Sequence, residues 1–202
     1  MLAGMATVIT VPDSDLARGA SAWARAVEPD FLVNHSYRTF HLGAALLASA
    51  SRSFDAEILY VASILHDIAL GTELDDGVTP FHLRGAGLAA AEVLRLGRTD
   101  DEATLVYDAV ALHMELSTAD DARSEVAGVH LGAAVDVVGM RIDQVPPAVL
   151  DAVLADHPRC DMKAAFAAVF RREATAKPYC AAASLVRTLG FLDLIAAAPF
   201  AE

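Results

Sequence analysis

The sequence is poor in cysteine and in basic residues, and each shortage excludes a class of protein. Its two cysteines, Cys160 and Cys180, are too few for a disulfide framework and do not lie in a CxxC spacing. The 15 Lys and Arg residues against 27 Asp and Glu give a net charge of −12, which lacks the basic footprint of nucleic-acid-binding proteins. The same charge repels anionic membrane surfaces. We therefore expect reduced thiols in a cytoplasmic protein that binds neither nucleic acid nor membrane. A homo-oligomer is left open.

Long apolar runs and targeting segments are lacking as well. No apolar stretch reaches the ~20 residues that a membrane-spanning helix needs. The opening residues, MLAGMATVITVPDS, have neither the basic start nor the long apolar stretch of a signal peptide. Hydrophobic residues nevertheless make up 55% of the chain, which is long enough to bury a substantial core. Alanine, leucine and valine dominate this fraction, which favours a compact helical protein.

Apolar residues recur at three- and four-residue spacing along most of the chain, and we therefore predict an all-α fold. Asn34 is the expected N-cap of the first helix, Thr99 and Glu102 have the spacing of a capping box, and Gly97 is a natural C-cap. Helices are predicted over 35–52, 54–70, 83–97, 99–116, 125–141, 146–158, 162–176 and 183–198.

Only residues 5–11, MATVITV, have a strand-like pattern. We expect residues 1–30 to form an N-terminal extension and first segment, and residues 31–202 to form one domain with C-terminal helices.

The run ILHDIAL places His66 and Asp67 among apolar residues, although burying an unpaired charge is expensive. Two other predicted helices each turn a polar side chain inward, namely His35 and Asp136. Two imidazoles and two carboxylates suit a divalent cation such as zinc, iron, nickel or manganese. The four residues therefore predict a metal site.

Each of these residues also has a structural interpretation. A buried histidine is more often a hydrogen-bonded core residue than a ligand, and Asp136 is a candidate salt-bridge partner of Arg38. His41 and His157 are expected to serve packing or to lie on the surface. His130 precedes Asp136 by six residues, which is not a same-face spacing, so it is not expected to reach the site.

The order His35, His66-Asp67, Asp136 resembles that of the HD-domain superfamily of metal-dependent enzymes. The phrases NHSYRTFHLG, EILYVASILHDIAL, YDAVALH, HLGAAVDVVG and HPRCDMKAAFAAVFRREATAKPYC are similar to successive blocks of its cyanamide hydratase-like branch, and the similarity covers roughly residues 31–193. The resemblance implies a single helical HD-domain bundle around a metal site. It implies one divalent ion per chain as the cofactor, with His35, His66, Asp67 and Asp136 as ligands.

The resemblance also implies an enzyme that uses metal-activated water on a small-molecule substrate, by phosphohydrolase-type hydrolysis or by cyanamide hydratase-like hydration. Asp67 and His113 are the expected proton acceptors, and His82 with His113 would contact substrate or hold a second ion. The alternative is a non-catalytic metal-binding or regulatory module.

The segment FHLRGA departs from the branch, where an acidic residue follows the aromatic one. Phe81, Arg84 and Arg38 are therefore our candidates for substrate binding. An arginine directed at the metal would favour an anionic substrate, whereas a narrow apolar pocket would favour a small neutral one.

Overall fold

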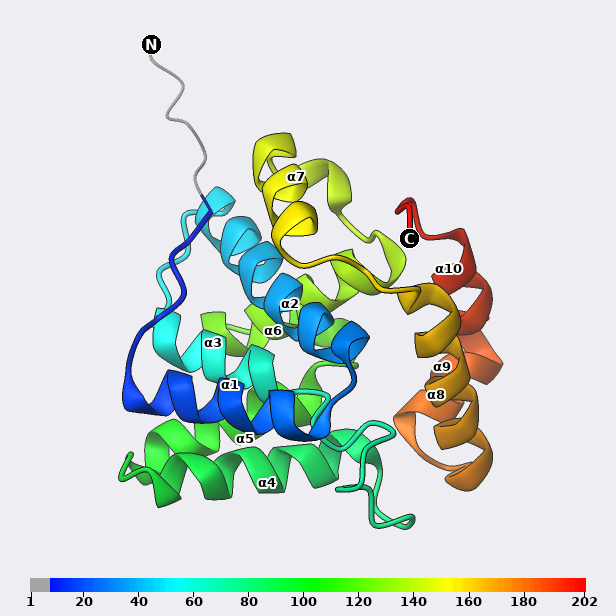
Figure 1. Ribbon diagram of the computed structural model, residues 1–202, viewed down its shortest axis with the longest axis horizontal. Coiled ribbons are helices and arrows are strands. Elements are labelled where there is room, and N and C mark those ends of the chain that lie inside the picture. The colour runs from blue at the N-terminus through cyan, green and yellow to red at the C-terminus, as the bar shows by residue number, and fades with distance from the viewer. Residues whose placement is uncertain (1–7) are drawn as a thin grey trace.

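The computed structural model describes residues 8–202, and every regular element in this range is a helix, ten of them α-helices (Figure 1). The predicted all-α class is thereby confirmed. The α-helices are α1 (Asp15–Val27), α2 (Asp30–Ser49), α3 (Ala56–Leu65), α4 (Phe81–Arg95), α5 (Asp100–Leu112), α6 (Ser124–Val138), α7 (Pro147–Asp156), α8 (Met162–Ala176), α9 (Ala181–Leu189) and α10 (Phe191–Ala197). Two short 3-10 helices are η1 (Leu116–Asp120) and η2 (Ile142–Gln144). Among the described helices, none is both long enough and apolar enough to cross a bilayer.

Two hydrophobic cores meet at the centre of the molecule. The larger one joins α1 to α7, with α2 and α6 in the middle and the α4–α5 hairpin along the lower edge of Figure 1. The smaller one joins α8, α9 and α10, on the right of Figure 1, to Leu32, Phe81 and Val137. The inward polar residues therefore lie where the two cores adjoin.

The central helices α2 and α6 approach so closely that only glycine fits between their backbones. A Cβ on Gly132 would lie 1.9 Å from the carbonyl oxygen of Thr39, and a Cβ on Gly43 would lie 2.2 Å from that of Gly128. These two contacts step four residues along each helix in opposite directions. The helices therefore run antiparallel in a single register.

One further step of four residues in this register brings His35 opposite Asp136. Their side chains meet there in a hydrogen bond of 2.7 Å. The glycine contacts thus determine which polar side chains meet in the interior.

Helix α1 was not predicted, and it belongs to the main core. Ser14 accepts a hydrogen bond from the Ala17 amide and caps the helix, while Leu16, Ala20 and Ala24 are buried, with α1 packed against α3. The N-cap residue and the three- to four-residue apolar spacing were visible in the sequence. The first segment of the chain is therefore part of the folded core from Asp15 onward.

Several predicted helix boundaries were also wrong. Helix α2 begins at Asp30 rather than after Asn34, whose side chain instead donates to the Pro158 carbonyl. Helix α9 ends before Gly190, which has a φ of 60°, so the helix expected over 183–198 is two helices. Glycine adopts this left-handed backbone conformation without strain. Residues 8–11 form no strand, and the rest of the strand-like segment 5–11 lies outside the described residues.

The helix expected over 54–70 ends at Leu65, so His66 and Asp67 lie in the turn that follows. The amide of Ile68 donates to the Leu65 carbonyl and that of Leu70 to the Asp67 carbonyl. Adjacent residues of an ideal helix point about 100° apart. The turn replaces that constraint and lets both side chains approach one point.

We expect Gly132→Ala to destabilise the protein by about 3 kcal/mol or more, because its methyl group has no space against the α2 backbone. Gly87→Ala is the matched control. Gly87 lies in α4, and a Cβ there meets nothing within 4 Å, so the better helix former should add about 0.5–1 kcal/mol. Urea unfolding of both variants measures the difference. Equal effects would show that the close approach of α2 and α6 is not a constraint.

Candidate metal centre

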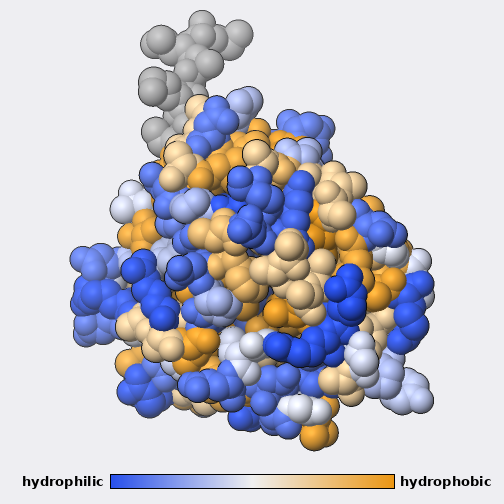
Figure 2. All heavy atoms as spheres, turned by 45° about the vertical axis from the view of Figure 1, so that its right-hand side comes forward, coloured by the Kyte–Doolittle hydropathy of each residue, from blue (hydrophilic) through white to orange (hydrophobic). Residues whose placement is uncertain are grey.

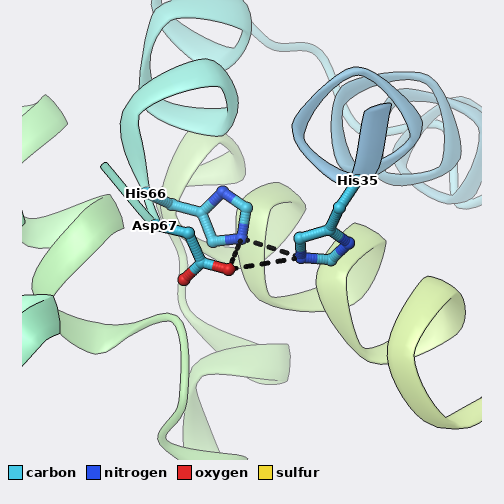
Figure 3. Close-up of side chains that lie close together, drawn as sticks. All are labelled: His35, His66 and Asp67. Atoms are coloured by element: carbon cyan, nitrogen blue, oxygen red, sulfur yellow. Dashed lines mark hydrogen bonds and ion pairs between the residues drawn. The ribbon is translucent and has the colours of Figure 1, made fainter. Parts of the chain in front are cut away.

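Three buried side chains from two segments converge on one point (Figure 3). His35 lies in the second turn of α2, and His66 and Asp67 lie in the turn after α3. His35 Nε2 is 3.1 Å from His66 Nε2 and 3.6 Å from Asp67 Oδ2, and His66 Nε2 is 3.4 Å from the same oxygen. Three candidate ligand atoms thus face one another without contact with bulk water.

The hydrogen bonds of the other ring nitrogens decide what faces this point. His35 Nδ1 donates to Asp136 Oδ2 at 2.7 Å, and His66 Nδ1 donates to the Ser63 carbonyl oxygen at 2.7 Å. With Nδ1 as the donor, the neutral form of each ring carries its lone pair on Nε2. Two lone pairs beside a carboxylate cannot hydrogen-bond to one another, and this arrangement calls for a cation between them.

The spacing of the three atoms fits a divalent transition metal. Zinc binds imidazole nitrogen and carboxylate oxygen at about 2.0–2.2 Å, so two such donors on one ion lie roughly 3.0–3.6 Å apart. The observed separations of 3.1, 3.4 and 3.6 Å fall in this range. Neither oxygen of Asp67 has a hydrogen-bond partner. His35, His66 and Asp67 are therefore equipped to hold a metal ion, as the sequence predicted for these three.

The structure places Asp136 behind His35 and not among the converging atoms. Its carboxylate accepts hydrogen bonds from Arg38 Nε at 2.7 Å and Nη2 at 2.9 Å, from Arg159 Nη1 at 2.9 Å, and from His35 Nδ1. Burial alone would raise the pKa of Asp136, but Arg38 and His35 outweigh it and hold the pKa below its ordinary value. The ion pair with Arg38 is the alternative that the sequence had left open.

His113 and His130 stand on the far side of Asp67. His113 Nδ1 donates to the Val110 carbonyl at 2.6 Å, so its Nε2 lone pair faces Asp67 Oδ1 at 3.7 Å. His130 Nδ1 donates to the His113 carbonyl at 2.8 Å. The sequence predicted that His113 lies near the site. The sequence did not predict that His130 reaches the site. The spacing of residues along α6 gives no information about the contact between α6 and the end of α5.

His82 and Phe81 open α4 beside this group. The pKa of Asp67 responds to His82, which is buried and whose Nδ1 has no hydrogen-bond partner. The ring of Phe81 packs against His113 with centroids 5.8 Å apart, and against Phe170 at 5.8 Å. Phe81 therefore supports His113 from behind and does not line the cavity described below.

Burial keeps His66 and His113 neutral. It lowers the pKa of His66 to about 3, with the nearby His35 adding to the effect, and it lowers the pKa of His113 to about 3, with His66 adding. Burial raises the pKa of Asp67, against the opposing pull of His113 and His35. Neutral imidazoles with free lone pairs are the protonation state in which histidine binds metals.

Glu28, just after α1, is a buried carboxyl group that no motif marked. Both of its oxygens lack a hydrogen-bond partner. Burial, and then the negative charge of Asp67, raise its pKa well above the ordinary value. The N-terminal segment thus places a carboxyl group within the electrostatic reach of the site.

An apolar cavity of about 100 Å³ opens onto the converging atoms. Its polar lining consists of His35, His66, Asp67, His113 and His130. The rest of the wall is aliphatic or aromatic and comes from α6, α8, α9, α10 and the segments after α5 and α6. No lysine or arginine is among these lining residues.

Neither arginine predicted to bind substrate reaches the cavity. Arg38 is fully buried and donates to Asp136 and to the His157 and Pro158 carbonyls. Arg84 donates to the Leu74 carbonyl and lies 3.9 Å from Asp76 on the loop before α4. The contacts of both arginines thus hold neighbouring segments of the chain together and do not involve the cavity.

The model of the HD-domain family matches residues 32–157, more than half of the chain and all of the residues that converge here. The chain belongs to the HD-domain family. The predicted membership is confirmed, and this HD-domain protein is accordingly a metal-dependent enzyme of that family, in which His35, His66 and Asp67 form a group that could hold a metal ion.

The HD-domain protein is also similar to two curated proteins of Saccharomyces cerevisiae, cyanamide hydratase DDI2 and cyanamide hydratase DDI3. Each is 27% identical over 177 residues, which cover 85% of this chain and 78% of the relative. The similarity therefore extends beyond the 126 residues, 32–157, of the family match and includes part of the first or last helices.

We expect the metal-free protein to lose stability as the pH falls below about 6.5. The unfolded chain binds protons near pH 6.5, whereas folded His66 and His113 stay neutral down to about pH 3. Each such group should contribute a slope of about 1.4 kcal/mol per pH unit between these values. Urea unfolding in EDTA measures the slope, and His113→Gln should reduce it by about that amount. An unchanged slope in this variant would contradict the prediction.

Proposed function

We propose that this HD-domain enzyme adds water to a carbon–nitrogen triple bond in a small neutral molecule, as in the hydration of cyanamide. The observation that carries the proposal is the cavity at the converging ligands, whose wall is apolar and has no cationic side chain. The two relatives named cyanamide hydratases agree with it.

The charge of the cavity argues against a phosphate ester as substrate. A phosphomonoester carries a charge of about −1.5 to −2 at neutral pH, and proteins bind such groups with arginine, lysine or backbone amides. Here the two arginines that the sequence predicted to bind substrate, Arg38 and Arg84, are held by Asp136 and by the Leu74–Asp76 loop. A neutral substrate enters an apolar cavity without the desolvation cost of a dianion.

The metal would be held by His35 Nε2, His66 Nε2 and Asp67 Oδ2. A divalent ion in such a site lowers the pKa of a bound water to about 7 and supplies the nucleophile at neutral pH. Asp136 keeps His35 in the tautomer that presents Nε2, and Arg38 and Arg159 hold Asp136 in place. The Ser63 carbonyl does the same for His66.

His113 is our candidate for moving the proton. His113 lines the cavity, and its Nε2 is a hydrogen-bond acceptor that lies 3.7 Å from Asp67 Oδ1. Hydration of R–C≡N requires one proton to leave the water and one to reach the nitrogen, which gives the imidic acid R–C(OH)=NH. Transfer of its hydroxyl proton to the nitrogen then gives the amide R–C(=O)NH₂. His113 Nε2 would accept the first proton and return it to the nitrogen. His82 would assist as a hydrogen-bond partner of water beside Asp67.

We expect the purified protein to carry about one divalent transition metal per chain, and His66→Gln to abolish binding because it removes a ligand. Asp136→Asn should weaken binding by about 10- to 100-fold, since it only loosens the orientation of His35. Element analysis and metal titration, with circular dichroism as the check on folding, measure both effects. His157→Gln is the control, because His157 is half-buried and stacks on Tyr37 outside the site.

Loss of metal from Asp136→Asn as complete as that from His66→Gln would make Asp136 a direct ligand. Full retention in His66→Gln would mean that the site lies elsewhere.

We expect the metal-loaded enzyme to convert cyanamide to urea and to leave p-nitrophenyl phosphate intact. His113→Gln should retain the metal and lose about 10²-fold in kcat, which is typical for loss of a proton-transfer group. Urea release, measured with zinc, iron, manganese and nickel in turn, decides the matter. Hydrolysis of the phosphate ester would overturn the proposal, and metal binding without turnover of any nitrile or cyanamide would favour the non-catalytic alternative.

A further inference from the structure

Part of the apolar wall of the cavity comes from a segment of the chain that the family match does not cover. Six of its apolar residues lie in α8, α9 and α10, beyond residue 157, where the match ends. They are Phe166, Phe170, Leu185, Leu189, Phe191 and Leu194. The polar lining, by contrast, lies entirely within the matched residues. The polar lining therefore comes from the matched residues alone, whereas the apolar wall comes from both parts of the chain.

The rim of the same cavity is apolar although it is exposed to water. Leu189 and Leu194 are 45% and 46% exposed, and Leu116 and Met140 on the opposite side are exposed as well. On the face that carries α8 to α10, apolar surface lies between charged residues (Figure 2). Exposed apolar patches rimmed by polar residues mark binding sites, and this one continues inward to His35 and Asp67.

The size of the cavity sets the size of the group that fits it. A comparable apolar cavity of 150 Å³ in another protein stays dry and binds benzene. By that measure about 100 Å³ holds roughly four non-hydrogen atoms, and the exposed apolar rim at Leu189 and Leu194 extends the space outward for the end of a longer substituent. The amino group of cyanamide is smaller than this and polar, and it would leave most of the apolar wall without contact.

We propose that the natural substrate carries an apolar substituent of about four carbons, which α8, α9 and α10 select. This inference rests on the proposed hydration. The group R of R–C≡N lies against the wall formed by Phe166, Phe170 and Leu194, and the nitrile points to the metal site. Water adds its oxygen to the carbon and both hydrogens to the nitrogen, and no oxidant or reductant is required.

Binding of product-like amides tests the inference without turnover. Acetamide, propanamide, butanamide and pentanamide are titrated into the protein as purified, by calorimetry or NMR. The affinity should rise about fourfold for each added methylene, because each is transferred from water to the apolar wall. The double variant Leu189→Ala/Leu194→Ala should lose about tenfold for pentanamide and little for acetamide.

The control is Leu94→Ala. Leu94 is 45% exposed, as Leu189 is, but it lies on α4 and not on the cavity. This variant should bind every amide as the unaltered protein does.

Each part of the proposal fails separately. Affinity that does not rise with chain length, while cyanamide is hydrated, overturns the apolar substituent and leaves the hydration intact. Rising affinity without hydration of pentanenitrile or cyanamide overturns the hydration and, with it, the assignment of this ligand as a substrate. Flat affinity together with self-association that the double variant abolishes would show that the rim binds a second copy of the chain.

Discussion

Both the fold and the site depend on the hydrogen bonds that the buried carboxylate of Asp136 accepts. It accepts hydrogen bonds from His35 and Arg38 of α2 and from Arg159 in the connection between α7 and α8. Arg38 also donates to the His157 carbonyl and so fastens that connection to α2. Removing one member of a buried charge network typically costs about 3–5 kcal/mol, because it leaves the others unpaired. The group that orients His35 is thus also the group that joins three segments of the chain.

This network is possible because α2 and α6 lie in backbone contact. The glycines at 43, 128 and 132 leave no space for a side chain between the helices. Packed backbones of this kind cannot slide by one residue without collisions, so His35 and Asp136 meet in one register only. A ligand that must be held to within about 0.5 Å is best placed on such a rigid pair of helices.

The remaining helices position the other side chains around His35 and Asp136. The turn after α3 brings His66 and Asp67 to His35, and the end of α5 brings His113 to the other oxygen of Asp67. Helices α8 to α10 close the opposite side, where Phe166 packs its ring edge-on against His35 with centroids 5.2 Å apart. The same apolar residues therefore pack against His35 and line the cavity in front of it.

The sequence by itself determined the helical class and the capping box of α5. It also named His35, His66 and Asp67 as candidate metal ligands. Helical periodicity and capping are local properties, and the HD dipeptide with its flanking blocks is a short contiguous pattern. A local signal also existed for α1, in Ser14 and the apolar spacing that follows it.

Only the tertiary structure decided the contacts of Asp136, the position of His130 at the cavity and the composition of the cavity wall. Asp136 was identified as an inward polar residue, but two arginines, one of them 23 residues away in the sequence, compete for its oxygens. The apolar wall consists of residues that read as ordinary core in each helix taken alone. Which atoms meet depends on how helices that are distant in sequence pack together. The periodicity of a single helix carries no information about its position relative to another helix.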